Sequence, residues 1–409
     1  MFPLLKVLAI FLIIIIMLRR KFSLGVTMLV STSVLGFLFG LGWLPLIRQV
    51  GLTLVSPSTV ELIAALVLIM ILESVMRQTL MLRAMTDSLF KLPWNPRVLL
   101  ISIPAIVGFL PSAGGARFSA PLVAAATSGS PYRSEDKVFI NFWFRHIWEY
   151  SLPLYPGLLL ASHFSGIPLS TILIWQWPFT VLWLLLGYWY VFRRYKKEDT
   201  VEKIKAAKPD RPIPQEGANP LKSLVANTWP LWATVMLVLG RVPIVPALSV
   251  VLGLLIFQKR YSPKAIYRTL TDRLTIQIVF LTWGTMAFKD VLEVSGAIPQ
   301  VSGAISSLGI PTDIIIFLLP LMIGLLTGLV QACIGVAFPL VMSMIEPTAG
   351  YVMLAYVSGV VGVMLSPVHL CLILTVEYFK TDFMRSYKPL LLPGMTVAAV
   401  SLAAFELLK

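Results

Sequence analysis

Two arginines stand inside segments that are otherwise apolar, Arg117 and Arg145. An isolated arginine at membrane depth is costly, so each is expected to have a partner or a task. Arg117 follows Gly115 at the expected start of a helix, where backbone N–H groups and the helix dipole favour an anion. A guanidinium there would add a bidentate clamp for a carboxylate. The functional interpretation is substrate contact, and the structural alternative is that Arg117 pairs with Glu149 or with a backbone carbonyl.

Arg145 and Glu149 lie four residues apart, with His146 between them. This spacing puts both charges on one helix face, where they can neutralise each other as a structural pair. The functional alternative is a proton site, in which Glu149 alternates between its protonated and ionised forms beside the Pro153 break. His146 titrates near neutral pH when unperturbed and would share that task, although a lone buried histidine is more often a packing residue.

In the second half of the chain, His369 and Glu377 follow a Ser366–Pro367 break and lie about two helical turns apart, roughly on one face. Glu377 is alternatively an anchor at the membrane end. Hydroxyl side chains would coordinate a cation or bond their own helix carbonyls. We expect the substrate to contact Ser112, Ala113, Gly114, Gly115, Arg117, Ser119, Arg145, Gln331, Ser366 and His369. We expect the coupling ion to engage His146, Glu149, Ser151, Thr375 and Glu377.

These residues are positioned by an unusual stretch, Ile106 to Pro121, in which Pro-Ser-Ala-Gly-Gly interrupts an apolar run. Neither apolar arm approaches the roughly 20 residues that a spanning helix needs. The two arms therefore predict a re-entrant hairpin whose tip lies at membrane depth. Lipid cannot satisfy the opened backbone, so the tip must face protein or a watery cavity.

The composition defines the class of protein. The chain has 409 residues, of which 57% are hydrophobic and 13% charged, and this predicts an all-α polytopic membrane protein. The 33 basic residues outnumber the 19 acidic ones, but they cluster in short loops beside apolar segments, as in cytoplasmic loops. Nucleic-acid binding is therefore not expected. The two cysteines, Cys333 and Cys371, lie in apolar segments and indicate neither a disulfide framework nor a cysteine-based metal site.

The same order of parts occurs twice along the chain. The first repeat covers residues 1–192, with scaffold spans (1–76), an interfacial arm (77–95), a hairpin (97–130), a broken helix (138–164) and a plain span (169–192). A cytoplasmic linker covers residues 193–223. The second repeat covers residues 224–409, with scaffold spans (224–288), an arm (290–308), a hairpin (313–345), a broken helix (351–379) and a last span (389–408). Gly115…Pro121-Leu122-Val123 matches Gly335…Pro339-Leu340-Val341, which supports an internal repeat.

The number of crossings between equivalent parts is odd, so the two repeats are expected to be inverted. Within the first scaffold, the second span is expected over residues 25–47. Glu61 and Glu73 are expected at solvated or interfacial ends of the third span. The N-terminus is predicted outside the cytoplasmic membrane, because Arg19-Arg20-Lys21 follows the first span. Inverted repeats with paired broken helices are typical of secondary transporters.

The chain resembles the ion transporter superfamily, which includes gluconate permeases, citrate and dicarboxylate carriers, and the membrane subunits of TRAP carriers. The resemblance covers nearly the whole chain and rests on the order of parts. It also rests on two motifs, Leu110-Pro111-Ser112-Ala113-Gly114-Gly115 and the stretch from Ser366 to Phe379, which ends in Glu-Tyr-Phe. More closely, the chain is similar to an uncharacterised prokaryotic integral-membrane family placed in that superfamily.

The resemblance implies an elevator-type carrier and a homodimer. Sodium-coupled dicarboxylate carriers have Ser-Asn-Thr at both hairpin tips, whereas this chain has Ser112-Ala113-Gly114 and Gln331-Ala332-Cys333. No metal is therefore assigned with certainty, and the tips are the places where Na⁺ would bind.

We expect a non-enzymatic carrier for a small organic anion, coupled to H⁺ or Na⁺, with no resident cofactor and with the lipid bilayer as its surroundings. An intramembrane enzyme and an ion channel are the alternatives. His-Glu-x-x-His, a phosphate loop and Gly-x-Ser-x-Gly are all absent from the sequence, which argues against the enzyme.

Overall fold

The computed structural model describes residues 2–20, 22–110, 115–193, 219–306 and 309–409. These residues fold into α-helices and one short 3-10 helix, and no β-strand occurs among them. The helices of the first half are α1 (Phe2–Arg19), α2 (Leu24–Leu38), α3 (Trp43–Val55), α4 (Pro57–Gln78), α5 (Met81–Lys91), α6 (Pro96–Gly108), α7 (Ala116–Ala126), α8 (Ser134–Arg145), η1 (Ile147–Tyr150), α9 (Pro156–Ser165) and α10 (Leu169–Phe192). The predicted linker, residues 193–223, lies largely outside the described residues.

The helices of the second half follow a similar sequence of lengths. They are α12 (Pro220–Leu239), α13 (Ile244–Lys259), α14 (Pro263–Leu270), α15 (Arg273–Val294), α16 (Ala297–Ser306), α17 (Thr312–Thr327), α18 (Val330–Met342), α19 (Ala349–Met364), α20 (Leu370–Phe379) and α21 (Phe383–Leu408). Several helices begin with a proline in the first turn, among them α4, α9 and α12. Proline suits that position because its missing N–H would have no helical partner there.

Four of the described helices are long and apolar enough to span a membrane: α1, α4, α10 and α21. Large apolar side chains also lie exposed on the surface, for example Leu8 on α1, Leu44 on α3 and Phe257 on α13. Extensive exposed apolar surface is uncommon in soluble monomers and is typical of a surface that meets lipid or another apolar partner. The all-helical prediction is confirmed, and these apolar helices are compatible with a membrane protein.

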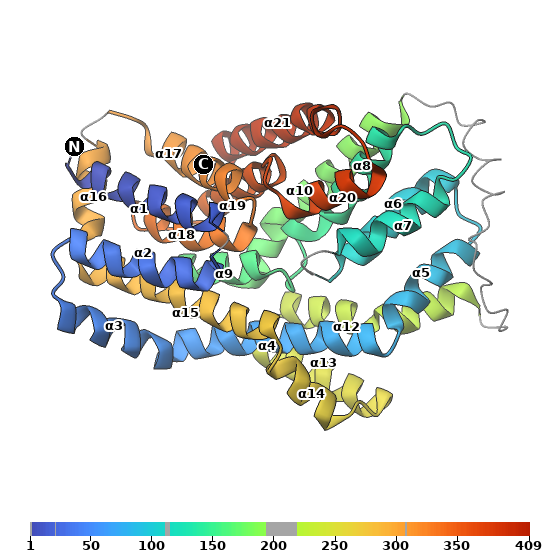
Figure 1. The fold of residues 1–409 in the computed structure, drawn as a ribbon, viewed down its shortest axis with the longest axis horizontal. Coiled ribbons are helices and arrows are strands. Elements are labelled where there is room, and N and C mark those ends of the chain that lie inside the picture. Colours follow the sequence, from blue (N-terminus) through green and yellow to red (C-terminus); the bar gives the residue numbers. More distant parts are fainter. Residues whose placement is uncertain (1, 21, 111–114, 194–218, 307–308) are drawn as a thin grey trace.

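The predicted second span, residues 25–47, is instead two helices, α2 and α3. The chain turns between them at Gly40, whose φ of +88° is readily adopted only by glycine. Gly42 then precedes the first residue of α3. Figure 1 shows α3 running on into α4, with the short break at Ser56 just before Pro57.

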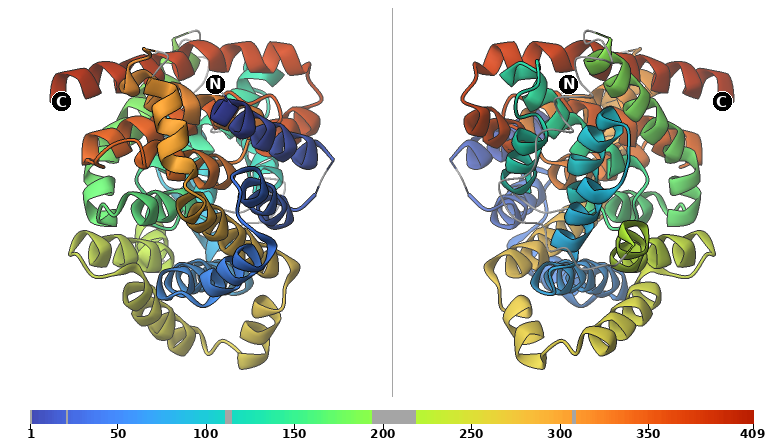
Figure 2. Two further views of the ribbon diagram at one scale, coloured as in Figure 1. Left: turned by 90° about the vertical axis from the view of Figure 1, so that its left-hand side faces the viewer. Right: turned by 90° about the vertical axis from the view of Figure 1, so that its right-hand side faces the viewer.

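The helices form layers. Figure 1 shows α3, α4 and α12 to α14 along one long side of the molecule, and α17, α19 and α21 along the opposite side. The two end views in Figure 2 keep the same separation, with the yellow-green α12 to α14 at one extreme and the red α21 at the other. The broken segments around α8, α9, α18 and α20 lie between these layers.

Many helix contacts join the first half of the chain to the second. α1 contacts α16, and α12 contacts α5; α2 contacts α15, and α13 contacts α4. In the same way α6 contacts α8, while α17 contacts α19, and α7 contacts α20, while α18 contacts α9. Most of these contacts join one half to the other, so neither half is packed as an independent domain.

Trp143 of α8 and Trp183 of α10 pack these two helices against each other. The rings of Trp143 and Trp183 stack with centroids 3.7 Å apart, and both side chains are completely buried. The Trp143 indole N–H donates to the Trp183 carbonyl at 2.8 Å, and the Trp183 indole N–H donates to the Trp143 carbonyl at 3.0 Å. Because buried indole donors are satisfied reciprocally, this pair fixes α8 two residues before Arg145.

Candidate functional site

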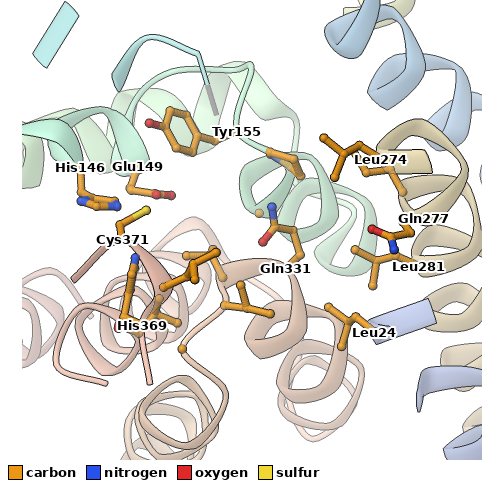
Figure 3. A pocket seen from close by; sticks show the side chains of 18 of the residues that line it. Leu24, His146, Glu149, Tyr155, Leu274, Gln277, Leu281, Gln331, His369 and Cys371 are labelled. Carbon is orange, nitrogen blue, oxygen red and sulfur yellow. Dashed lines mark hydrogen bonds between the residues drawn. The ribbon is translucent and has the colours of Figure 1, made fainter. Parts of the chain in front are cut away.

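A cavity of about 330 Å³ lies at the meeting point of the broken helices. One wall comes from the first turn of α2 and from α4 and α15, and the opposite wall from the breaks of α8–α9, α17–α18 and α19–α20. Figure 3 shows this arrangement, with His146, Glu149, Cys371 and His369 gathered on one side and Leu24, Leu274, Gln277 and Leu281 on the other.

The breaks that form the cavity have local causes. α17 ends just before Gly328, whose φ is +64°, and α18 begins two residues after that glycine. α19 ends before Ser366–Pro367, and the Ser366 hydroxyl accepts a hydrogen bond from the Val368 N–H at 3.3 Å. α8 ends at Arg145, and a 3-10 turn precedes the restart of α9 at Pro156. Proline and left-handed glycine both stop a helix without strain.

Helix N-termini converge on the cavity. Its lining includes the first residues of α2, α9, α15, α18 and α20. The dipole at each of these ends favours negative charge, and Ser23 and Asp272 already cap α2 and α15 through side-chain hydrogen bonds. Arg145 adds a full positive charge, and its side chain is only 5% exposed. The cavity is therefore electrostatically suited to a small anion.

Two carboxyl groups face this positive lining from opposite walls. Glu149 belongs to η1, is 8% exposed and lines the cavity next to Tyr155. Glu73 belongs to α4, is 4% exposed and forms an ion pair with Arg77, which also lines the cavity. Both carboxyl groups are placed where they could exchange a proton with an enclosed solute.

Two imidazoles and a thiol form a compact group on the wall made by α8 and α20. The ligand-type atoms of His146, His369 and Cys371 all lie within 4.8 Å of one another. The His146 and His369 ring centroids are 5.0 Å apart, in an edge-to-face arrangement. The Arg145 Nη1 donates to the Cys371 sulfur at 3.2 Å. Within the described residues, these three side chains form a group of the ligand types that could hold a transition metal.

Hydrogen bonds hold the broken α8–α9 segment in place. The Tyr155 hydroxyl donates to the Gly108 carbonyl at 2.6 Å, and the Trp148 indole donates to the Ala105 carbonyl at 2.8 Å. The Tyr356 hydroxyl of α19 donates to the Glu149 carbonyl at 2.9 Å. The segment that carries Arg145 and Glu149 is thus tied to α6 on one side and to α19 on the other.

The structure brings together five of the predicted site residues. Those that line the cavity are Arg145, His146, Glu149, Gln331 and His369. Arg145 and Glu149 lie on the same wall of the cavity, where the Arg145 Nη1 also donates to the Cys371 sulfur at 3.2 Å.

Other predicted residues do not line the cavity. Arg117 is exposed on α7, and Glu377 is exposed on α20. Gly115 precedes α7, and the buried Ser119 hydroxyl donates to its carbonyl at 3.3 Å. Several others bond within the protein. Ser151 accepts from Thr180, Thr375 donates to the Cys371 carbonyl, and Ser366 accepts from the Val368 N–H. Ser112, Ala113 and Gly114 at the first hairpin tip lie outside the described residues.

The sequence matches the model of a family described as a protein of unknown function (DUF401) over residues 4–407. The chain belongs to the DUF401 family. No curated protein matches its sequence. The match spans both groups of helices that form the cavity, so the whole site of this DUF401 protein lies within the family's region.

Several residues lining the cavity of this DUF401 protein were not among those predicted. Glu73 was expected at a solvated or interfacial end of its span, and this expectation is wrong because the side chain is buried against Arg77 and faces the cavity. Cys371 is not among the predicted site residues. His369 lies two residues before it in the sequence, but nothing in the sequence indicates that His146 lies beside both. Tyr155 and Gln277 also line the cavity, and the polarity of Gln277 within an apolar helix is the one signal that could have revealed it.

Proposed function

We propose that this protein is a secondary active transporter that moves a small organic anion across the cytoplasmic membrane. The observation that carries the proposal is the cavity itself, where helix N-termini converge around the buried Arg145. Discontinuous helices whose N-termini face an anionic substrate are a recurring arrangement in secondary transporters. A volume of about 330 Å³ suits a small carboxylate rather than a large ligand.

The proposed architecture is two inverted repeats, each with an arm, a hairpin and a broken helix. The corresponding contacts of the two halves support it. If α1 to α10 correspond to α12 to α21, then α1–α16 corresponds to α12–α5, and α2–α15 corresponds to α13–α4. The same pairing relates α7–α20 to α18–α9. Such reciprocity is expected where an internal pseudo-two-fold axis relates two intertwined repeats.

The proposed transport mechanism is of the elevator type. The cavity lies between α2, α4 and α15 on one side and the broken helices on the other. In this proposal the first group belongs to the scaffold and the second to a mobile transport domain. Sliding of the second group past the first would carry the bound anion from one side of the membrane to the other. The homodimer and the external N-terminus are parts of the same proposal.

The coupling ion in this proposal is H⁺ or Na⁺. Glu149 supports H⁺, because its carboxyl group lines the cavity and is almost completely buried. A buried carboxyl group that is exposed alternately to two compartments can take up a proton on one side and release it on the other. For Na⁺, Gly328 and Gln331 line the cavity, and backbone carbonyl and side-chain amide oxygens are ligands of the right type.

Reconstituted proteoliposomes provide the test. Uptake of radiolabelled gluconate, citrate and succinate is measured under an imposed pH gradient, an imposed Na⁺ gradient, or neither. We expect saturable, gradient-dependent accumulation of at least one anion. Arg145→Gln should abolish it, whereas Arg117→Gln should retain it, because Arg117 is exposed and does not line the cavity.

Two results would overturn the proposal. Non-saturable flux that persists without a gradient would identify a channel. Unchanged uptake by Arg145→Gln, combined with loss in the Arg117→Gln control, would move the anion site to the first hairpin and away from the cavity.

A further inference from the structure

The group of His146, His369 and Cys371 has a geometry that the proposed anion transport does not require. His146 is the residue that follows α8, and His369 and Cys371 stand at the start of α20. All three side chains are at least nine-tenths buried, with exposures of 3%, 7% and 8%. Figure 3 shows the Cys371 sulfur between the two imidazole rings. Three ligand-type side chains from two distant segments therefore point toward one place.

Hydrogen bonds determine which imidazole nitrogens are available. The His146 Nδ1 lies 2.6 Å from the Phe142 carbonyl, and the His369 Nδ1 lies 3.0 Å from the Val363 carbonyl. A carbonyl can only accept, so each Nδ1 carries the proton and donates. In a neutral imidazole the lone pair is then on Nε2. In metal-binding histidines, the ring nitrogen that does not bind the metal characteristically donates a hydrogen bond. That bond sets the tautomer and the ring orientation.

The Cys371 sulfur, the third ligand-type atom of the group, also has a hydrogen-bond partner. The Arg145 guanidinium donates to the Cys371 sulfur at 3.2 Å, which fixes the position of the third ligand atom. Metals bind cysteine as the thiolate. The chain's other cysteine, Cys333, has a different environment, because its thiol donates to the Pro320 carbonyl at 3.2 Å in the packed interior of α18.

We propose that His146, His369 and Cys371 bind a thiophilic divalent metal ion, with Zn²⁺ as the best match. Two imidazoles and one thiolate are borderline and soft ligands of the kind that Zn²⁺ prefers. In a tetrahedral zinc site neighbouring ligand atoms are roughly 3.5 Å apart. The present separations of up to 4.8 Å require only a modest inward rotation of the side chains.

The metal would have an open fourth position. All three protein ligands line the cavity, so the remaining coordination position faces its interior. Sites with three protein ligands and one open position take water or a small solute as the fourth ligand. The metal and the anion would then bind next to each other. The site itself, however, requires no transport and stands independently of the proposed function.

Cobalt provides a direct probe of this site. The full-length protein in detergent is stripped of metal and titrated with Co²⁺, which gives a thiolate-to-metal charge-transfer band when a cysteine is a ligand. We expect one Co²⁺ per chain, the charge-transfer band, and displacement of Co²⁺ by Zn²⁺, which binds such ligands more tightly.

Matched cysteine variants identify the ligand. Cys371→Ser should lose the charge-transfer band, and Cys333→Ser should retain it, although both replace a buried cysteine. His369→Gln should weaken Co²⁺ binding by at least tenfold, because even the loss of an outer-sphere partner costs roughly 10–100-fold. Size-exclusion profiles and tryptophan fluorescence show whether each variant is folded.

Three results would overturn the inference. The first is the absence of Co²⁺ binding to the folded protein. The second is binding without a thiolate band, and the third is a band of equal strength in Cys371→Ser. The titration uses no transported anion, so failure to find a substrate in proteoliposomes leaves this result unaffected.

Discussion

The backbone contact between Gly108 and Arg145 offers a sharp test of how the cavity is positioned. Gly108 ends α6, and a Cβ atom built on it would lie 2.1 Å from the Arg145 carbonyl oxygen and 3.0 Å from its carbonyl carbon. Both neighbouring atoms belong to the backbone, so no side chain can rotate away. The Gly108 carbonyl also accepts the hydrogen bond from Tyr155. Any movement of Gly108 therefore disturbs both ends of the α8–α9 break.

The size of the effect follows from these distances. Ordinary van der Waals contact begins at 3.4 Å, so Gly108→Ala requires α6 and the end of α8 to separate by about 1.3 Å (3.4 − 2.1). Overpacking of this kind costs about 1–3 kcal/mol. Gly253→Ala is the matched control, because Gly253 is exposed within α13 and its Cβ would meet nothing within 4 Å. The control should be stabilising by about 0.4–1 kcal/mol.

Two measurements check this prediction. Unfolding of the purified protein by SDS in mixed micelles, followed by tryptophan fluorescence, should show Gly108→Ala less stable than the Gly253→Ala control by about 1.4–4 kcal/mol. Co²⁺ titration should show about tenfold weaker binding to Gly108→Ala, because displacement of Arg145 also displaces the adjacent His146. Equal stability and equal Co²⁺ affinity of the two variants would refute the reasoning that the α6–α8 contact positions the site.

Three further predictions concern other parts of the cavity and its support. Glu149→Gln removes the buried carboxyl group of η1, so uptake should lose its pH dependence; an unchanged pH profile in proteoliposomes would exclude Glu149 as the proton carrier. Trp183→Phe removes the indole bond to the Trp143 carbonyl and should cost about 1–3 kcal/mol in SDS unfolding, whereas an unchanged midpoint would mean that the pair does not hold α8. Asn141 donates to the Thr375 hydroxyl at 3.0 Å, and a double-mutant cycle of Asn141→Leu with Thr375→Val should give a coupling free energy of about 0.6 kcal/mol. A coupling energy of zero would contradict the link between α8 and α20.

The helix breaks could be predicted from the sequence because their causes are local. One helix stops beside the predicted Ser366–Pro367 break, and another stops at Gly328, within the predicted hairpin 313–345. Polar residues within apolar segments were equally visible, and this is why Arg145, His146 and Glu149 were recognised as candidates. The break between α2 and α3 was missed, because Gly40 and Gly42 lie in an apolar run that also fits a continuous span.

The remainder of the site depends on which segments meet in space. Cys371 lies two residues after His369 in an apolar segment, and only folding places His146 and Arg145 beside them. Glu73 and Arg77 have the spacing of a surface ion pair, and only the packing of α4 shows that Glu73 is buried. The orientation of Arg117 on its helix was likewise beyond sequence reasoning, because one polar residue in a short apolar helix does not identify the face that is buried.

The distance along the chain between His146 and Cys371 has a consequence for biosynthesis. A ribosome that has made only the first half has already synthesised Arg145, while the sulfur that it contacts is still to be translated. The contact between them can therefore form only when the final tenth of the polypeptide has emerged. Products that terminate before Cys371 would have the α8 side of the cavity without the α20 side that completes it.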